Sequence, residues 1–199
     1  PLWTLEQARA NATPLDFAHH APVVPRALGR KVFQNFDLAE IAKYIDWGPF
    51  FQTWDLAGPY PAILDDEIVG EQARNVLADA QVMLKKIIEG RWLQANGVMG
   101  LFPANRVGDD IVFYTDESRT QVLSTWYGMR QQTEKQIVEG VMRPSRCLSD
   151  FVATKDSGIA DYAGMFAVTA GIGAEKKDKE FEAALDDYSG IMFKALADR

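Results

Sequence analysis

The strongest pattern of apolar and polar positions lies between residues 65 and 89. Apolar side chains recur there at steps of three and four residues, so they line up along one face of a helix. Acidic residues begin the stretch and two lysines stand near its end, an order that suits the helix dipole. The pattern predicts a helix from about Asp65 to Glu89, which Gly90 closes and Gly70 weakens. Its buried stripe is Val69, Ala73, Val76, Ala80, Met83 and Ile87.

Two other stretches have helical periodicity. The first begins at Asp37, and Asp37 and Glu40 have the spacing of a capping box. Gly48-Pro49 is expected to end this helix. The second runs from about Glu175 to the end of the sequence, with Gly190 as a weak point. The first stripe is Leu38, Ile41 and Ile45, and the second is Phe181, Leu185, Tyr188, Ile191 or Met192, and Ala195.

Between these helices the apolar pattern becomes that of strands. Strands are predicted at 98–102, 111–114, 120–127, 151–154 and 165–169. A polar turn holding Asn105 and Gly108-Asp109 joins the first two, and Gln136–Ser145 is expected to be a surface loop or a short helix. Helices and strands do not alternate as they do in a doubly wound sheet. The predicted fold class is α+β, with a mostly antiparallel twisted sheet flanked by long helices.

Residues 1–36 precede this pattern and are rich in proline and alanine. Leu5–Ala10 is expected to form a helical turn, after which three prolines between residues 14 and 25 interrupt regular structure. We therefore predict an extended N-terminal arm or linker over 1–36, wrapped on a domain over 37–199. Because the chain begins with proline, we also expect it to be a piece of a longer protein.

Composition narrows the possible partners. The chain has 21 basic and 28 acidic residues, a net charge of −7, which argues against a nucleic-acid surface. The single cysteine, Cys147, excludes an intramolecular disulfide and a cysteine-rich zinc site. No apolar run approaches the roughly 20 residues of a membrane span. We expect a cytoplasmic protein that binds neither nucleic acid nor membrane.

Asp46 is the leading candidate for a ligand-binding residue. It stands among aromatic residues in the stretch Tyr44–Trp54 and near the end of the helix predicted from residue 37, where a carboxylate is disfavoured by about 0.3–1 kcal/mol. That placement invites a cation, either a basic side chain or a positively charged ligand in an aromatic cleft. The alternative is a local cap in which Asp46 accepts the backbone N–H of Gly48 or its neighbour. Phe50 and Trp54 are expected in the core, and Trp47 is left open between core and ligand platform.

The other polar motifs favour structural roles. His19-His20 lacks a second ligand cluster nearby, so a metal site is not expected. The carboxylates of Asp109 and Asp110 are neighbours on a strand or turn and should point apart. Gly171-Ile172-Gly173 lacks the spacing of a phosphate-binding loop, and no motif surrounds Cys147. Arg106 is left open as a residue that faces a partner.

Five ordered blocks of sequence carry a resemblance to a known family. They are Tyr44–Trp47, Gly100–Asp110, Arg130–Lys135, Ala160–Tyr162 with Phe166–Thr169, and Asp186–Tyr188 with Lys194–Arg199. Together they resemble the C-terminal activation domain of cobalamin-dependent methionine synthase. Only Gln136–Arg146 looks longer than the corresponding loop of the family.

The resemblance implies a reactivation module within a methyltransferase that makes methionine from homocysteine and methyltetrahydrofolate. Such a module supplies a methyl group from S-adenosylmethionine to oxidised cob(II)alamin, while a reduced flavodoxin-type partner supplies an electron. It implies that Asp46 contacts S-adenosylmethionine and leaves Trp47 as a further candidate for that site. The cobalamin is bound by a neighbouring module of the same enzyme, and zinc belongs to a module absent here.

One departure from the family is severe. Its second ligand-binding motif, Arg-x-x-x-Gly-Tyr, lies downstream of the last helix and does not occur in residues 1–199. We therefore expect an incomplete activation domain over 37–199 that is inactive when isolated. The alternative is a non-catalytic interaction module that docks a corrinoid protein or a flavodoxin. A hydrolase built on Asp65-Asp66 or Asp186-Asp187 is disfavoured, because these acids stand at helix ends.

Overall fold

The computed structural model describes residues 1–169 and 171–199, which divide into two compact units. Unit 1 comprises Pro1–Lys31 and Met99–Phe166, and unit 2 comprises Val32–Val98 and Ala167–Arg199. Helices and a largely separate sheet make up the described chain, so the predicted α+β class is confirmed.

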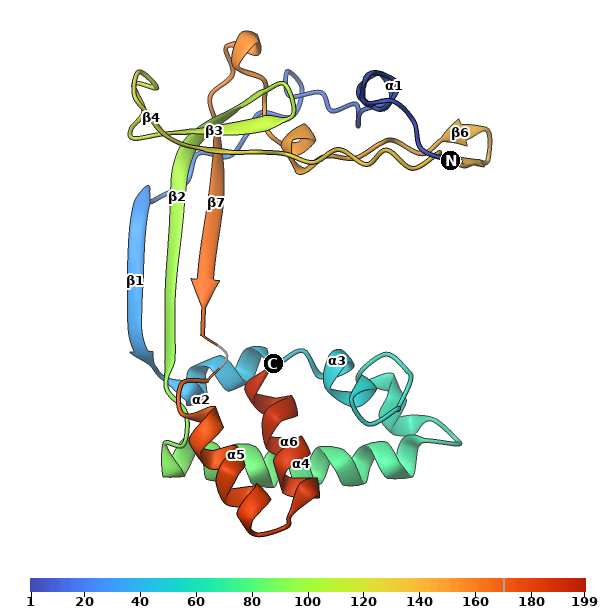
Figure 1. Ribbon diagram of the computed structural model, residues 1–199, viewed down its shortest axis with the longest axis vertical. Coiled ribbons are helices and arrows are strands. Elements are labelled where there is room, and N and C mark those ends of the chain that lie inside the picture. Colours follow the sequence, from blue (N-terminus) through green and yellow to red (C-terminus); the bar gives the residue numbers. More distant parts are fainter. Residues whose placement is uncertain (170) are drawn as a thin grey trace. The chain divides into compact units, whose positions relative to one another are not determined.

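Strands from both halves of the sequence form the main sheet of the described residues (Figure 1). The order is β1 (Gly29–Phe36), β2 (Ala95–Val107), β3 (Asp110–Tyr114) and β4 (Val122–Trp126), with β7 (Asp161–Val168) also paired to β2. β3 lies antiparallel to both β2 and β4. The prediction placed Asn105 in the turn, which is wrong, because β2 continues through it and pairs it with Val112. The turn itself is Gly108-Asp109, with Gly108 at a φ of 63°.

Unit 1 has a small apolar core made by β2 and β3 together with the chain after residue 150. Its members are Ala104, Ile111, Phe113 and Val152, with Phe102, Trp126 and Ala163 packed against them. The strand predicted at 151–154 is wrong: a 3-10 helix covers Leu148–Phe151, and Thr154 makes only an isolated bridge to Arg106. Helix α1 occupies Leu5–Ala10, as predicted.

The loop or helix predicted at 136–145 is instead a small hairpin of unit 1. Its strands are β5 (Ile137–Val138) and β6 (Val141–Met142). Glu139 and Gly140 connect them with φ angles of 52° and 79°. Two successive positive φ values give the turn the twist that a two-residue hairpin requires.

Unit 2 is built around α4 (Gly70–Gly90), whose predicted apolar stripe is buried from Ala73 to Ile87. The helix begins five residues later than predicted, because the carboxylate of Asp66 accepts the backbone amides of Ile68 and Val69 and forms a turn there. At the other end, Arg91 rather than Gly90 adopts the left-handed conformation that closes the helix.

The prediction of a single C-terminal helix is wrong, because two helices occupy that part of the sequence. These are α5 (Ala174–Ala183) and α6 (Asp187–Ala197). Leu185 breaks the path with a φ of 54°, and Asp186 caps α6 by accepting the amide of Ser189 at 3.1 Å. The break lets α5 fold back against α6, where the rings of Phe181 and Phe193 lie 5.8 Å apart.

Candidate functional site

Asp46 lies at the N-terminus of a helix of unit 2, not near the C-terminus of one as predicted. The preceding helical segment is α2 (Leu38–Ile41) with a 3-10 turn at Ala42–Tyr44, and Asp46 is the N-cap of α3 (Trp47–Gln52). Its Oδ1 accepts the backbone N–H of Gly48 at 3.1 Å. A negative charge at this end of a helix is favoured by the helix dipole, which removes the electrostatic cost that the sequence suggested.

The local cap occupies only part of the Asp46 carboxylate. The residue is exposed, and among the described residues neither a hydrogen bond nor an ion pair reaches Oδ2. Gly48 and Pro49, which were expected to end a helix, form the first turn of α3 instead. The carboxylate can therefore cap α3 and still receive a positively charged group from solvent.

The aromatic residues around Asp46 mostly form the core of unit 2. Phe50 and Phe51 are fully buried, and Phe51 stacks on Tyr60 with ring centroids 6.1 Å apart. Trp54 packs against the same core and against the ring of Tyr188 at 5.1 Å. Trp47 is half-buried and meets Phe50 edge to face at 5.2 Å. Trp47 is thus the member of the group that combines a core contact with access from solvent beside Asp46.

An apolar cavity of about 520 Å³ lies in unit 2. The predicted stripe of Leu38, Ile41 and Ile45 lines it, so this stripe faces a hollow rather than a filled core. The opposite walls come from β1, α4 and the last residues of the chain. Asp198 and Arg199 are the charged side chains of the lining, which also includes Phe33, Phe36, Leu84, Ile88, Leu93 and Val168.

The cavity adjoins the helix that Asp46 caps but does not include Asp46 itself. Ile45 lines the cavity, whereas the next residue does not. Arg199 links the two places, because its Nη2 donates to the carbonyl of Pro49 in α3 at 3.5 Å. In the sequence, Arg199 stands out only as the last residue of a family block, and no local pattern predicts that it reaches a helix 150 residues away in the chain.

The family blocks around residues 106–110 and 130 meet in a buried ion cluster of unit 1. Arg130 donates to Asp109 Oδ1 from Nε and Nη2 at 2.9 and 2.7 Å, and to Asp150 Oδ1 and Oδ2 at 2.6 and 2.9 Å. Arg106 pairs with Asp150 at 2.9 Å and so belongs to the same cluster. Arg9 completes the cluster through Asp109 Oδ2 at 2.8 Å. Asp110 points elsewhere and accepts the amide of Gly128.

Hydrogen bonding keeps this cluster ionised. Burial alone would raise the pKa of Asp150, but the hydrogen bonds from Arg130 and from the amides of Cys147 and Thr13 outweigh it and lower that pKa to about 2. Burial also raises the pKa of Asp109, but the hydrogen bonds from the guanidinium groups of Arg130 and Arg9 outweigh it, so that pKa is lowered as well. The hydrogen bonds that Arg130 donates to Asp150 and Asp109 raise the pKa of its guanidinium. The cluster therefore stabilises unit 1 and has no group poised for proton transfer.

The remaining candidates have structural surroundings. His19 is exposed, with Nδ1 2.5 Å from Asp16 Oδ2, and no cluster suited to a metal ion occurs in residues 1–169 and 171–199. Cys147 is buried and accepts a hydrogen bond from the hydroxyl of Ser149. Asp66 accepts the amides of Ile68 and Val69 in the turn before α4, and Asp186 caps α6. Gly173 forms the N-cap of α5 at a φ of 102°, a turn rather than a phosphate loop.

Known proteins are similar to this chain over nearly all its length. The family model described as "Vitamin B12 dependent methionine synthase, activation domain" matches residues 37–199. A crystal structure of the MetH reactivation domain bound to AdoHcy is similar over 100% of this chain, with 49% identical residues and a TM-score of 0.86. This chain spans 59% of that longer chain. In the part of the chain that the structure describes, no helix is long and apolar enough to cross a membrane.

Proposed function

The chain belongs to the family of activation domains of vitamin B12-dependent methionine synthases, and from this premise we propose that it is a reactivation module that binds S-adenosylmethionine. The observation that carries the proposal is 49% identity to a reactivation domain whose structure holds AdoHcy. AdoHcy is what remains of S-adenosylmethionine after its methyl group has been transferred. The parent activity that we propose is the methyltransferase reaction that makes methionine from homocysteine and methyltetrahydrofolate.

Asp46 is the residue we assign to the methyl donor. S-adenosylmethionine carries a sulfonium and an ammonium, and an exposed carboxylate with a free oxygen attracts such groups. The cap fixes the carboxylate through Oδ1, so little side-chain entropy is lost when Oδ2 accepts a cation. Trp47 lies next to it in the chain and is half-buried, which supports a cation–π contact with the sulfonium.

The partners follow from the same reaction. Cobalamin, bound by a neighbouring module of the enzyme, receives the methyl group, and a flavodoxin-type protein supplies the electron. The role of this chain is to hold the donor in line with the cobalt, since positioning accounts for most of the catalysis in such a transfer. Zinc belongs to a different module. The single cysteine supports a cytoplasmic location.

Residues 1–199 hold one part of the donor site in this proposal. The Arg-x-x-x-Gly-Tyr segment expected from the family is not among them. We therefore expect weak or undetectable binding of S-adenosylmethionine by the 199-residue chain and measurable binding by a chain that also carries that segment. Micromolar affinity of the 199-residue chain, lost in Asp46→Ala, would contradict the division of the site.

Calorimetric titration of Asp46→Asn in the longer chain tests the role of Asp46. Asparagine keeps the cap oxygen but removes the charge, so we expect the Kd for S-adenosylmethionine to rise at least about tenfold. Asp37→Asn is the matched control, because Asp37 caps α2 through the amide of Ala39 in the same way. Equal affinities of the two variants would remove Asp46 from the site. Failure of the unmodified longer chain to bind would favour the non-catalytic docking module instead.

A further inference from the structure

We propose that residues 1–13 form a strap across the segment Gly128–Asp150 of unit 1, and that strap and segment open and close together as one unit of local unfolding. The match to the family model begins at residue 37 and does not include the strap. The proposal depends on contacts within unit 1 alone.

Main-chain hydrogen bonds join the strap to both arms of the segment. The amide of Trp3 donates to Gln132 at 2.7 Å, and the amide of Glu134 donates back to Pro1 at 3.1 Å. Farther along, the amide of Ser145 donates to Asn11 at 2.8 Å. Figure 1 shows the N-terminus beside β6, in agreement with these bonds. Backbone groups of the segment thus depend on the strap for their partners.

Side chains fasten the strap at two further points. Arg9 Nε lies 2.8 Å from Asp109 Oδ2, and the amide of Thr13 donates to Asp150 Oδ2 at 3.3 Å. These are the two carboxylates that hold Arg130. The strap therefore contacts both carboxylates of the ion cluster, of which Asp150 belongs to the segment and Asp109 does not.

The strap and the segment can open without unfolding the apolar core of unit 1. Ala8 is the one residue of the strap that is fully buried, and no strap residue belongs to the apolar core of the unit. The side chain of Arg9 is 55% exposed, whereas that of Arg130 is 2% exposed. Opening breaks the exposed ion pair of Arg9 and the hydrogen bonds of the strap, and it separates Arg130 from Asp109, which lies outside the segment. It leaves the apolar core intact. Such an element opens at a lower free energy than a core strand.

Amide hydrogen exchange of the full 199-residue chain tests the proposal. The amide of Trp3 lies in the strap, and those of Gln131 and Arg143 donate to Arg146 and Gln136 within the segment. All of them should exchange with one common protection factor, lower than that of the β3 amides. In Arg9→Ala, all three should exchange about fivefold faster while β3 is unchanged, because a half-exposed charged hydrogen bond is lost. Asn11→Ala should act similarly without touching the ion cluster, since Asn11 Nδ2 donates to the carbonyl of Arg143 at 3.0 Å.

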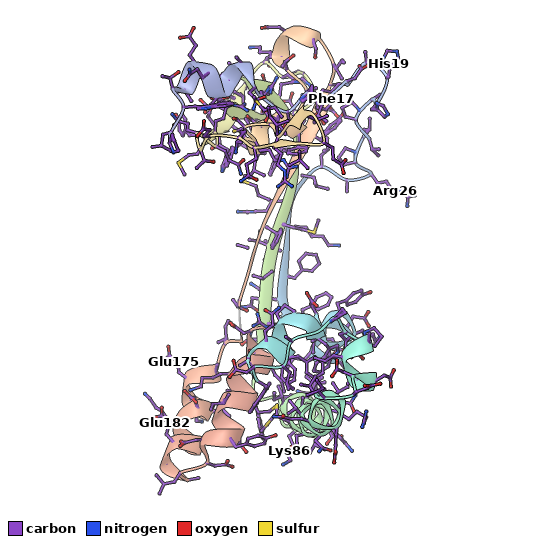
Figure 2. The ribbon with its side chains drawn as sticks, turned by 90° about the vertical axis from the view of Figure 1, so that its right-hand side faces the viewer. Phe17, His19, Arg26, Lys86, Glu175 and Glu182 are labelled. Carbon is purple, nitrogen blue, oxygen red and sulfur yellow. The ribbon has the colours of Figure 1, made fainter. Side chains whose placement is uncertain are left out.

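Arg26→Ala is the matched control. It removes the same charge from the N-terminal stretch, but Arg26 is exposed and projects away from the body of unit 1 (Figure 2). Exchange in this variant should equal that of the unchanged chain. Faster exchange confined to residues 1–13 in Arg9→Ala would overturn the proposal, because the segment would then be stable without the strap. Equal acceleration in β3 would overturn it as well, because opening would then be global.

Discussion

At the scale of single residues, partners decide what a carboxylate does. Asp46 is exposed and gives one oxygen to a helix cap, so its charge is available to a ligand. Asp150 is fully buried, and guanidinium and amide donors take up both of its oxygens. The first residue is suited to binding and the second to stability, although both are aspartates beside loops.

The Asp150 contacts should make the stability of unit 1 depend on pH. Its pKa of about 2 in the folded protein lies below the ordinary value of 3.8, so the folded state binds the proton less readily than the unfolded state. The contribution, about 2 kcal/mol by linkage, is present above pH 4 and is lost as the pH falls from about 4 towards 2. Urea unfolding, followed through Trp126, should show Asp150→Asn to be destabilised at pH 7 and to approach the unchanged chain near pH 2.5.

Asp156→Asn provides the control for that measurement. Asp156 is exposed in the same unit, and its substitution should leave the free energy of unfolding close to that of the unchanged chain throughout this pH range. A destabilisation by Asp150→Asn that stayed constant from pH 7 to pH 2.5 would show that the carboxylate acts through its shape and not through its charge.

At the scale of elements, two glycines in helices have opposite reasons to be there. A Cβ on Gly70 would lie 2.9 Å from the carbonyl oxygen of Leu64, so this glycine permits a close approach of two backbone segments at the start of α4. A Cβ on Gly190 would meet Asp178 and Phe181 at 3.6 and 3.7 Å, which is ordinary contact. Helix propensity alone treats both positions as weak points.

Substitution by alanine should separate these two cases. Gly190→Ala should raise the free energy of unfolding by about 0.5–1 kcal/mol, because alanine loses less backbone entropy on folding and fits the site. Gly70→Ala should lower it by about 1–3 kcal/mol, because the backbone of Leu64 must shift. Chemical denaturation of both variants measures the two signs, and a gain in stability for Gly70→Ala would show that this backbone yields easily.

At the scale of the whole molecule, two apolar cores serve two units. The core of unit 2 gathers Phe50 and Phe51 from α3, the α4 stripe, and Met192 and Phe193 from α6. The core of unit 1 is a separate group around Phe113. The buried residues of the unit 2 core come from positions 50–87 and 192–196, so this unit depends on packing between distant parts of the chain.

Unfolding of the two units should be separable. Phe193→Ala should cost unit 2 about 3–5 kcal/mol, because it leaves a cavity in a fully buried site. The protein can be labelled with 5-fluorotryptophan and followed by fluorine NMR. The signals of Trp47, Trp54 and Trp92 should then change at a lower urea concentration than in the unchanged chain, whereas those of Trp3 and Trp126 should change at the same concentration. Phe113→Ala should give the reverse pattern. A common shift of all five indoles in either variant would show that the units unfold as one.

Elements whose signals are local could be predicted from the order of the amino acids alone. The period of apolar residues placed the buried face of α4, and the β-branched and aromatic runs located β3 and β4. Five ordered motifs identified the family, because their residue order does not depend on how the chain folds.

Only the tertiary structure decided which distant groups meet. The break at Leu185 follows from the packing of α5 on α6, which no local pattern encodes. Asp46 became the beginning of α3 because α2 ends early and Gly48 offers its amide. Arg130 meets Asp109 and Asp150 across about twenty residues on either side, and Arg9 reaches Asp109 from a hundred residues away. Such contacts depend on chain topology, and a linear pattern of residue types contains no record of it.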